Sequence, residues 1–82
     1  MIKVGQVYSR VIDGHDWRFV ITYCSSSGLY YDYIFNDGST ISDEDADYLL
    51  DNSDRLVAEY PTWIEAINSP HFNRSIKNLG GM

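Results

Sequence analysis

The chain has 82 residues with twelve acids, six bases and one cysteine, giving a formal net charge of −6 at pH 7. This length allows one domain with a small aromatic core, and the acidic balance disfavours direct nucleic-acid binding, which relies on lysine and arginine to neutralise phosphates. The lone cysteine, the lack of a signal peptide and the lack of an apolar run near the ~20 residues that span a bilayer indicate a cytoplasmic protein without a membrane segment.

The first half of the chain predicts an antiparallel meander. Residues 7–12, 17–24 and 29–35 show the alternation typical of half-buried strands. One face of the second strand carries Trp17, Phe19, Ile21 and Tyr23. One face of the third carries Leu29, Tyr31, Tyr33 and Phe35. Turn signals separate these strands at residues 13–14, 25–28 and 36–39, and residues 40–41 start a short return strand.

The second half predicts two helices around a fifth strand. Ser42 and Asp45 resemble a capping box, which predicts a helix from residue 43 to about residue 50 with an apolar stripe of Ala46, Leu49 and Leu50. Residues 55–60 predict a strand. Thr62 and Glu65 form a complete capping box, which predicts a helix over residues 63–68.

The expected fold class is therefore α+β, in the order β-β-β-β-α-β-α. We expect a small curled antiparallel sheet, an SH3-like and partly open barrel, with one acidic helix and a short C-terminal helix. Residues 1–76 would form a single domain, and residues 77–82 a flexible C-terminal tail.

An acidic cluster fills residues 43–54. Asp43, Glu44 and Asp45 would complement the dipole at the start of the predicted helix. Asp47 and Asp51 would lie beyond the first turn, on the same helix face as Asp43, where like charges destabilise a helix. That cost favours a binding role, and the ~6 Å rise between these carboxylates is close to the phosphate repeat of a nucleic-acid strand. The predicted partner-binding residues are Asp43, Glu44, Asp47, Asp51, Asp54 and Tyr48. A solvated acidic face without a partner is the alternative.

The sequence allows three other interpretations of its possible binding sites. Asp43, Asp45 and Asp47 match the first ligand positions of a calcium-binding EF-hand, but Tyr48 stands where that loop needs glycine, so we expect no metal. An alternative aromatic face for stacking nucleic-acid bases would consist of Tyr30, Tyr33, Arg10 and Arg18. The exposed tyrosines could instead form a homodimer interface.

No catalytic pattern stands out in the sequence. His15 and His71 are isolated beside turn or cap residues, and Cys24 has no flanking base to activate it. We therefore expect a non-enzymatic protein without a cofactor.

Residues 60–72, with the sequence YPTWIEAINSPHF, resemble the C-terminal ends of small early proteins of phages and prophages of Gram-positive bacteria. The similarity covers about 13 of 82 residues and includes no catalytic motif. It implies an inhibitor of host defence or transcription, as anti-CRISPR proteins and nucleic-acid mimics are. On this basis we expect a basic, nucleic-acid-handling host protein as the partner, bound through the acidic helix in the cytoplasm of the bacterial host.

Overall fold

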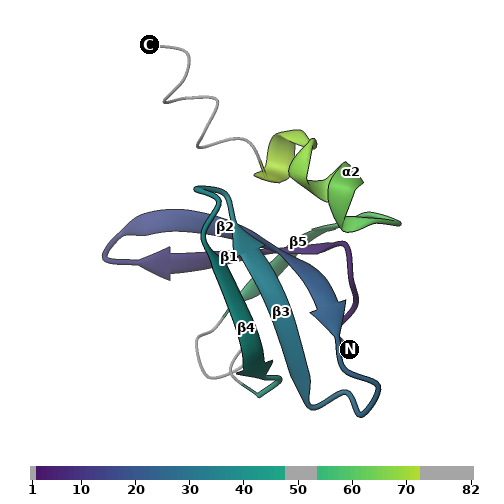
Figure 1. The fold of residues 1–82 in the computed structure, drawn as a ribbon. Coiled ribbons are helices and arrows are strands. Elements are labelled where there is room, and N and C mark those ends of the chain that lie inside the picture. The colour runs from purple at the N-terminus through teal and green to yellow at the C-terminus, as the bar shows by residue number, and fades with distance from the viewer. Residues whose placement is uncertain (1, 48–53, 73–82) are drawn as a thin grey trace.

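The computed structural model describes residues 2–47 and 54–72. Its elements are β1 (Gln6–Ile12), β2 (His15–Cys24), β3 (Tyr30–Phe35), β4 (Thr40–Asp45), β5 (Arg55–Glu59) and α2 (Trp63–Ile67). The strands form one antiparallel sheet in the order β4-β3-β2-β1-β5 (Figure 1). The sheet is open, because β4 and β5 are its two edges. The predicted small antiparallel sheet is confirmed, and the described part of the chain is mostly β.

Tight turns set the register of the meander. Asp13 and Gly14 both have positive φ, 50° and 80°, which matches the two-residue turn that suits the twist of paired strands. In the β3–β4 turn, the Asp37 carboxylate accepts hydrogen bonds from the backbone N–H and hydroxyl of Ser39, at 2.9 and 2.6 Å. These positions confirm the turns predicted at residues 13–14 and 36–39.

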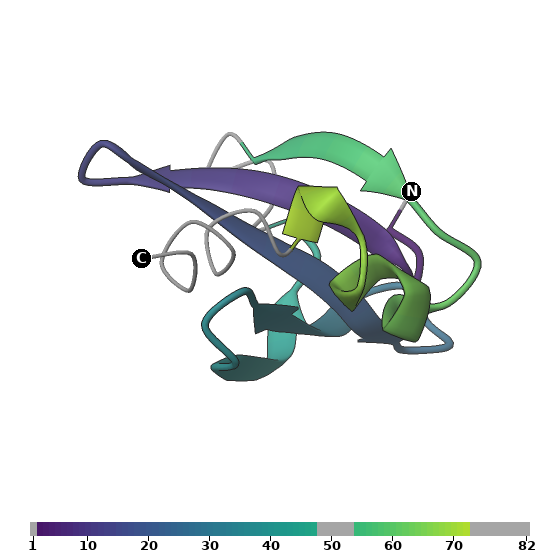
Figure 2. The ribbon, with the colours of Figure 1, turned by 90° about the horizontal axis from the view of Figure 1, so that it is seen from above.

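The two faces of the sheet are both apolar at their centres. We call one the inner face; its buried core contains Tyr8, Phe19, Ile21, Tyr31 and Tyr33. On the opposite, outer face, α2 packs against β1 and β2 (Figure 2). We call α2 together with residues 70–72 the helical segment. Its Ala66 and Phe72 form a second buried cluster with Val7 and Val20 of the sheet. Most of the alternation predicted for β2 and β3 is thereby confirmed.

Tyr23 departs from that alternation. A register shift between Ile21 and Tyr23 inserts an extra residue into β2, so that Tyr23 pairs with Asp32 and Cys24 with Tyr31. Such a bulge reverses the faces of the residues that follow it. The prediction that Tyr23 shares a face with Ile21 is therefore wrong: Tyr23 lies on the outer face and is 53% exposed.

The start of the predicted acidic helix is also wrong. Residues 43–45 belong to β4, where Glu44 pairs with Tyr31 and Asp45 with Tyr30. The turn at residues 36–39 returns the chain alongside β3, and the hydrogen bonds of this pairing outweigh the poor strand propensity of acidic residues. Residues 48–50, with which the predicted helix ends, lie outside the described residues, as does the predicted tail at 77–82.

The second predicted helix is confirmed. Thr62 caps α2, and its Oγ1 accepts a hydrogen bond from the backbone N–H of Glu65 at 3.2 Å. Asn68 and Ser69 interrupt it, and residues 70–72 are again helical. Within residues 2–47 and 54–72, no helix is long and apolar enough to cross a membrane.

Candidate functional site

Carboxylates line the β4 edge of the sheet. We call this group the acidic edge; its described members are Asp32, Asp43, Glu44, Asp45 and Asp47. The sequence has no lysine or arginine between Arg18 and Arg55. Among the described residues, the ion pairs are Arg10–Asp54 and Arg18–Asp16, so none involves the acidic edge. Within the described residues, the carboxylates of this edge therefore form no direct ion pair.

A bulge shapes the acidic edge. Two residues of β4, Ser42 and Asp43, stand opposite the single residue Asp32 of β3. Asp43 has a φ of 57°, in the left-handed region, and its backbone N–H donates to Asp32 Oδ1 at 2.9 Å. A left-handed conformation costs most L-residues about 1–2 kcal/mol, and less for aspartate. The bulge takes the Asp43 N–H out of the ladder of hydrogen bonds between β3 and β4. The Asp32 carboxylate accepts a hydrogen bond from this N–H in its place.

The carboxylates of the acidic edge do not all point the same way. Glu44 pairs with Tyr31 and so belongs to the inner face, where it accepts a hydrogen bond from the Tyr33 hydroxyl at 3.3 Å. Asp45 pairs with Tyr30 and belongs to the outer face, where it is exposed. Asp47 follows in the next turn and is also exposed; its backbone N–H donates to Asp45 Oδ1.

Asp54 does not belong to this exposed group. Its two carboxylate oxygens accept hydrogen bonds from Arg10 Nε and Nη2, at 2.9 and 2.7 Å, and its side chain is 0% exposed. The Arg10 guanidinium lies 4.8 Å from the ring centre of Phe19 and 5.4 Å from that of Tyr33. Burial alone would lower the pKa of Arg10, but the hydrogen bonds to Asp54 and Tyr33 raise it above its ordinary value. Asp54, predicted to bind a partner, is therefore a buried counter-ion of Arg10 and not an exposed carboxylate of the acidic edge.

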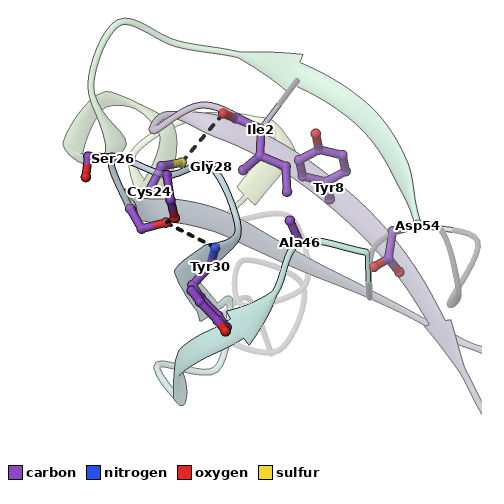
Figure 3. A pocket seen from close by; sticks show the side chains of 10 residues that line it. Ile2, Tyr8, Cys24, Ser26, Gly28, Tyr30, Ala46 and Asp54 are labelled. Atoms are coloured by element: carbon purple, nitrogen blue, oxygen red, sulfur yellow. Dashed lines mark hydrogen bonds between the residues drawn. The ribbon is translucent and has the colours of Figure 1, made fainter.

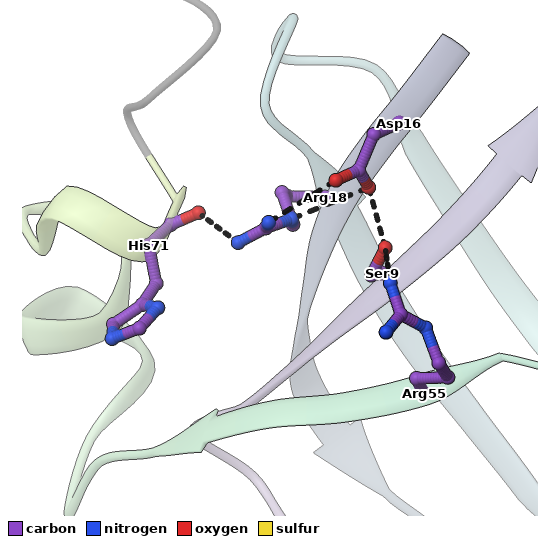
Figure 4. Close-up of polar contacts among 5 residues, drawn as sticks. All are labelled: Ser9, Asp16, Arg18, Arg55 and His71. Carbon is purple, nitrogen blue, oxygen red and sulfur yellow. Dashed lines mark hydrogen bonds and ion pairs between the residues drawn. The ribbon is translucent and has the colours of Figure 1, made fainter. Parts of the chain in front are cut away.

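The alternative aromatic face is not assembled. Tyr33 and Arg10 are buried on the inner face, whereas Tyr30 is 48% exposed on the outer face. Arg18 is buried on the outer face, next to the helical segment, where its Nη1 donates to the His71 carbonyl at 3.0 Å (Figure 4). The four residues therefore do not form one stacking surface.

Arg18 belongs to a polar cluster between the β1–β2 hairpin and the helical segment (Figure 4). It pairs with Asp16 at 3.1 Å, and Ser9 donates its hydroxyl hydrogen to the same carboxylate. The Arg18 hydrogen bond, followed by that of Ser9, lowers the pKa of Asp16. Arg55 Nη2 also approaches Ser9 Oγ, at 3.5 Å. These contacts tie β1, β2, β5 and residue 71 together, so the cluster has a structural role.

An open cavity of about 870 Å³ lies between the inner face and the β2–β3 loop (Figure 3). Three of its polar lining groups have partners: Cys24 Sγ–H donates to the Ile2 carbonyl at 3.6 Å, Ser25 Oγ accepts from the Tyr30 N–H at 3.1 Å, and Asp54 binds Arg10. Burial raises the pKa of the Cys24 thiol, which opposes formation of the reactive thiolate. The described lining thus offers no activated nucleophile.

A metal site is not formed by the acidic edge as described. No group of three or more histidine, cysteine or acidic side chains is arranged to hold a metal ion within residues 2–47 and 54–72. The extended β4 also differs from the loop that an EF-hand would start at Asp43.

Of the predicted partner-binding residues, the structure brings Asp43, Glu44 and Asp47 to the acidic edge and removes Asp54 from it. Tyr48 and Asp51 lie outside the described residues. Sequence reasoning missed the exposed Tyr23, because the extra residue that turns it outward has no marker such as glycine. No protein-family model matches the sequence, and no curated protein or solved structure matches it.

Proposed function

We propose that the protein is a non-enzymatic binding module that docks its acidic edge on a basic surface of a partner protein. The observation that carries this proposal is the set of exposed carboxylates on β4, Asp43 and Asp45, which form no ion pair within the described residues. Holding like charges together is unfavourable, and a basic partner would remove that repulsion. Rim charges of this kind mainly accelerate association and make binding sensitive to salt.

We also propose the biological role that the 60–72 resemblance implies, that of a phage-encoded inhibitor. Its target would be a nucleic-acid-handling host protein with a basic groove, because a groove that holds phosphates suits carboxylates as well. The acidic element is the edge strand β4 in place of the expected helix.

For the fold, we propose an SH3-like, partly open barrel. The order β4-β3-β2-β1-β5 supports it, since a four-strand meander is followed by a fifth strand that returns to pair with β1. The long β2, which joins both halves of the sheet and contains a bulge, gives the bend that such a barrel needs.

An acidic, bulged edge strand has a competing explanation. Natural sheets place charges and bulges on edge strands to prevent pairing with other sheets. Protection of the edge requires no partner, whereas the proposed function does, so a binding experiment separates the two.

The test compares two charge reversals at opposite edges of the sheet. Asp45→Lys changes the acidic edge, and Glu59→Lys changes the exposed last residue of β5 at the opposite edge. Both substitutions change the net charge by the same amount. In a pull-down from bacterial lysate at low salt, the wild type and Glu59→Lys should retain a basic protein that high salt releases. Asp45→Lys should retain at least about fivefold less. Equal retention by the two variants, with circular dichroism showing both folded, would overturn the proposed function.

A further inference from the structure

We propose that an arginine side chain of the partner binds on the outer face of β2, β3 and β4, between two exposed tyrosines and two carboxylates. We call this surface the tyrosine patch; it consists of Tyr23, Tyr30, Asp32 and Asp45. The inference rests on the proposed function and names the group that the partner contributes.

The register of the strands places the four side chains together. Tyr23 stands opposite Asp32, and Tyr30 stands opposite Asp45. Tyr30 and Asp32 are two residues apart on β3, so they share a face. Directly opposite residues in an antiparallel pair have Cβ atoms about 4.5–5.5 Å apart and diagonal neighbours about 7–8 Å, so each tyrosine lies beside a carboxylate and the two pairs are neighbours on one face.

This surface is open on the outer face of the sheet. Tyr23 is 53% and Tyr30 48% exposed, and the helical segment packs instead around Val7 and Val20. The two half-exposed tyrosines lie diagonally across β2 and β3, and tyrosine is common in protein-binding surfaces because it supplies contact area at a low entropic cost.

The inner face of the same sheet shows what such a combination holds. There the Arg10 guanidinium lies over aromatic rings, with Phe19 and Tyr33 the nearest, and binds the Asp54 carboxylate through two hydrogen bonds. The tyrosine patch has the same kinds of groups, rings beside carboxylates, but no ion pair of Asp32 or Asp45 is formed within the described residues. The missing component is a cation.

Arginine fits this surface better than lysine. Its planar guanidinium stacks on aromatic rings and presents two parallel N–H groups to a carboxylate, whereas the lysine ammonium is a strongly hydrated point charge. Desolvation is also less costly for arginine. An acidic partner segment would be repelled by Asp32 and Asp45.

The experiment titrates the full chain with two peptides of equal charge, Gly-Arg-Gly-Arg-Gly and Gly-Lys-Gly-Lys-Gly, at low salt, with isothermal calorimetry for affinity and NMR for the tyrosine ring signals. The arginine peptide should bind at least about threefold more tightly. Tyr23→Ala and Tyr30→Ala should each weaken its binding about threefold to tenfold, while Tyr30→Phe should retain it. Ile64→Ala, which changes an exposed apolar residue on α2, is the matched control and should have no effect.

The outcomes separate this inference from the proposed function. Equal affinity for the two peptides, or unchanged binding by both tyrosine-to-alanine variants, overturns the tyrosine patch as an arginine site even if Asp45→Lys still loses the lysate partner. Failure to bind any basic peptide or lysate protein overturns both. If Arg74→Gln shifts the Tyr23 and Tyr30 ring signals in the absence of peptide, the surface belongs to the chain's own C-terminal residues and the inference is likewise overturned.

Discussion

Tyr31 and Tyr33 have rings that are equally buried, but their hydroxyl groups differ. The Tyr33 hydroxyl accepts from Arg10 at 3.2 Å and donates to Glu44 at 3.3 Å. The Tyr31 hydroxyl is buried and has no hydrogen-bond partner among residues 2–47 and 54–72. A buried polar group without a partner costs about 1–3 kcal/mol, whereas a hydrogen bond to a charged group contributes about 1.5–3 kcal/mol.

We therefore expect opposite results from the same deletion of one oxygen. Tyr31→Phe should leave the free energy of unfolding unchanged or raise it by up to about 1 kcal/mol, and Tyr33→Phe should lower it by about 1–3 kcal/mol. Urea denaturation of the two variants checks this. If Tyr31→Phe lowered the free energy of unfolding as much as Tyr33→Phe, the two hydroxyl groups would not differ in their hydrogen bonding, and the prediction would be wrong.

Gly5 is a second position where one residue decides the local structure. Its φ is 93°, its N–H donates to the Ile21 carbonyl, and its carbonyl accepts from the Tyr60 N–H. A Cβ added to Gly5 would lie 2.1 Å from the Tyr60 carbonyl oxygen, a backbone atom that cannot move without breaking the β1–β5 pairing.

Gly5→Ala should accordingly lower the free energy of unfolding by about 3 kcal/mol or more, since strain and a steric clash add. Gly28→Ala is the matched control, with φ 77° but nothing within 4 Å of the added Cβ. It should cost only about 1–2 kcal/mol. Thermal and urea unfolding of both variants measure the difference; equal losses would show that conformation alone matters.

At the scale of the elements, β4 shows why sequence patterns predict some of this fold and miss the rest. The turns, the alternation in β3 and the capping of α2 are local, so neighbouring residues determine them. The pairing of residues 43–45 with β3 depends on the turn at 36–39 and on the Asp32 carboxylate, eleven residues away from Asp43. A weak capping signal at Ser42 is overruled by these non-local hydrogen bonds.

The Arg10–Asp54 pair joins elements in the same non-local way. The two residues are 44 positions apart, and their pairing attaches the start of β5 to the inner face. Composition predicted an acidic surface, but it gave no means to tell a buried counter-ion such as Asp54 from an exposed acid such as Asp47. Only the fold, which buries Arg10 among aromatic rings, makes that distinction.

Breaking this pair should be more costly than breaking the Arg18–Asp16 pair, in which the carboxylate is half-exposed. Asp54→Asn leaves the Arg10 charge buried without its counter-ion and should lower the free energy of unfolding by about 3–5 kcal/mol. Asp16→Asn, at a pair whose carboxylate side chain is 45% exposed, should cost about 1 kcal/mol or less. Denaturant unfolding of both variants at neutral pH checks the contrast, and similar losses would contradict the buried role of Asp54.

At the scale of the whole molecule, charge is divided between the two halves of the sheet. The half formed by β1, β2 and β5 carries both signs of charge, with Arg10, Arg18 and Arg55 beside Asp16 and Glu59. The half formed by β3 and β4 has acids only. The sequence shows this division directly, because no base lies between residues 18 and 55. Placing Tyr23 beside those acids required the bulge in β2, which the sequence does not mark.

The tyrosine-rich core has a consequence for the whole domain at high pH. Burial raises the pKa of Tyr8, Tyr31 and Tyr33 above the ordinary value of 10. A raised folded-state pKa means that the folded protein favours the neutral phenol. The contribution of these tyrosines to the free energy of unfolding is therefore complete below pH 10 and is lost as the pH rises through the folded-state pKa values.

We expect the free energy of unfolding to fall above about pH 10, by up to about 1.4 kcal/mol per pH unit for each buried tyrosine. Urea midpoints between pH 8 and pH 12 measure the slope. Tyr31→Phe should reduce it, because one titrating group is removed from the core. A Cys24→Ala background removes the contribution of the thiol, whose pKa is also raised by burial. Because ionised tyrosine needs water, a domain that kept its full stability at pH 12 would mean that these three rings open to solvent without unfolding the sheet.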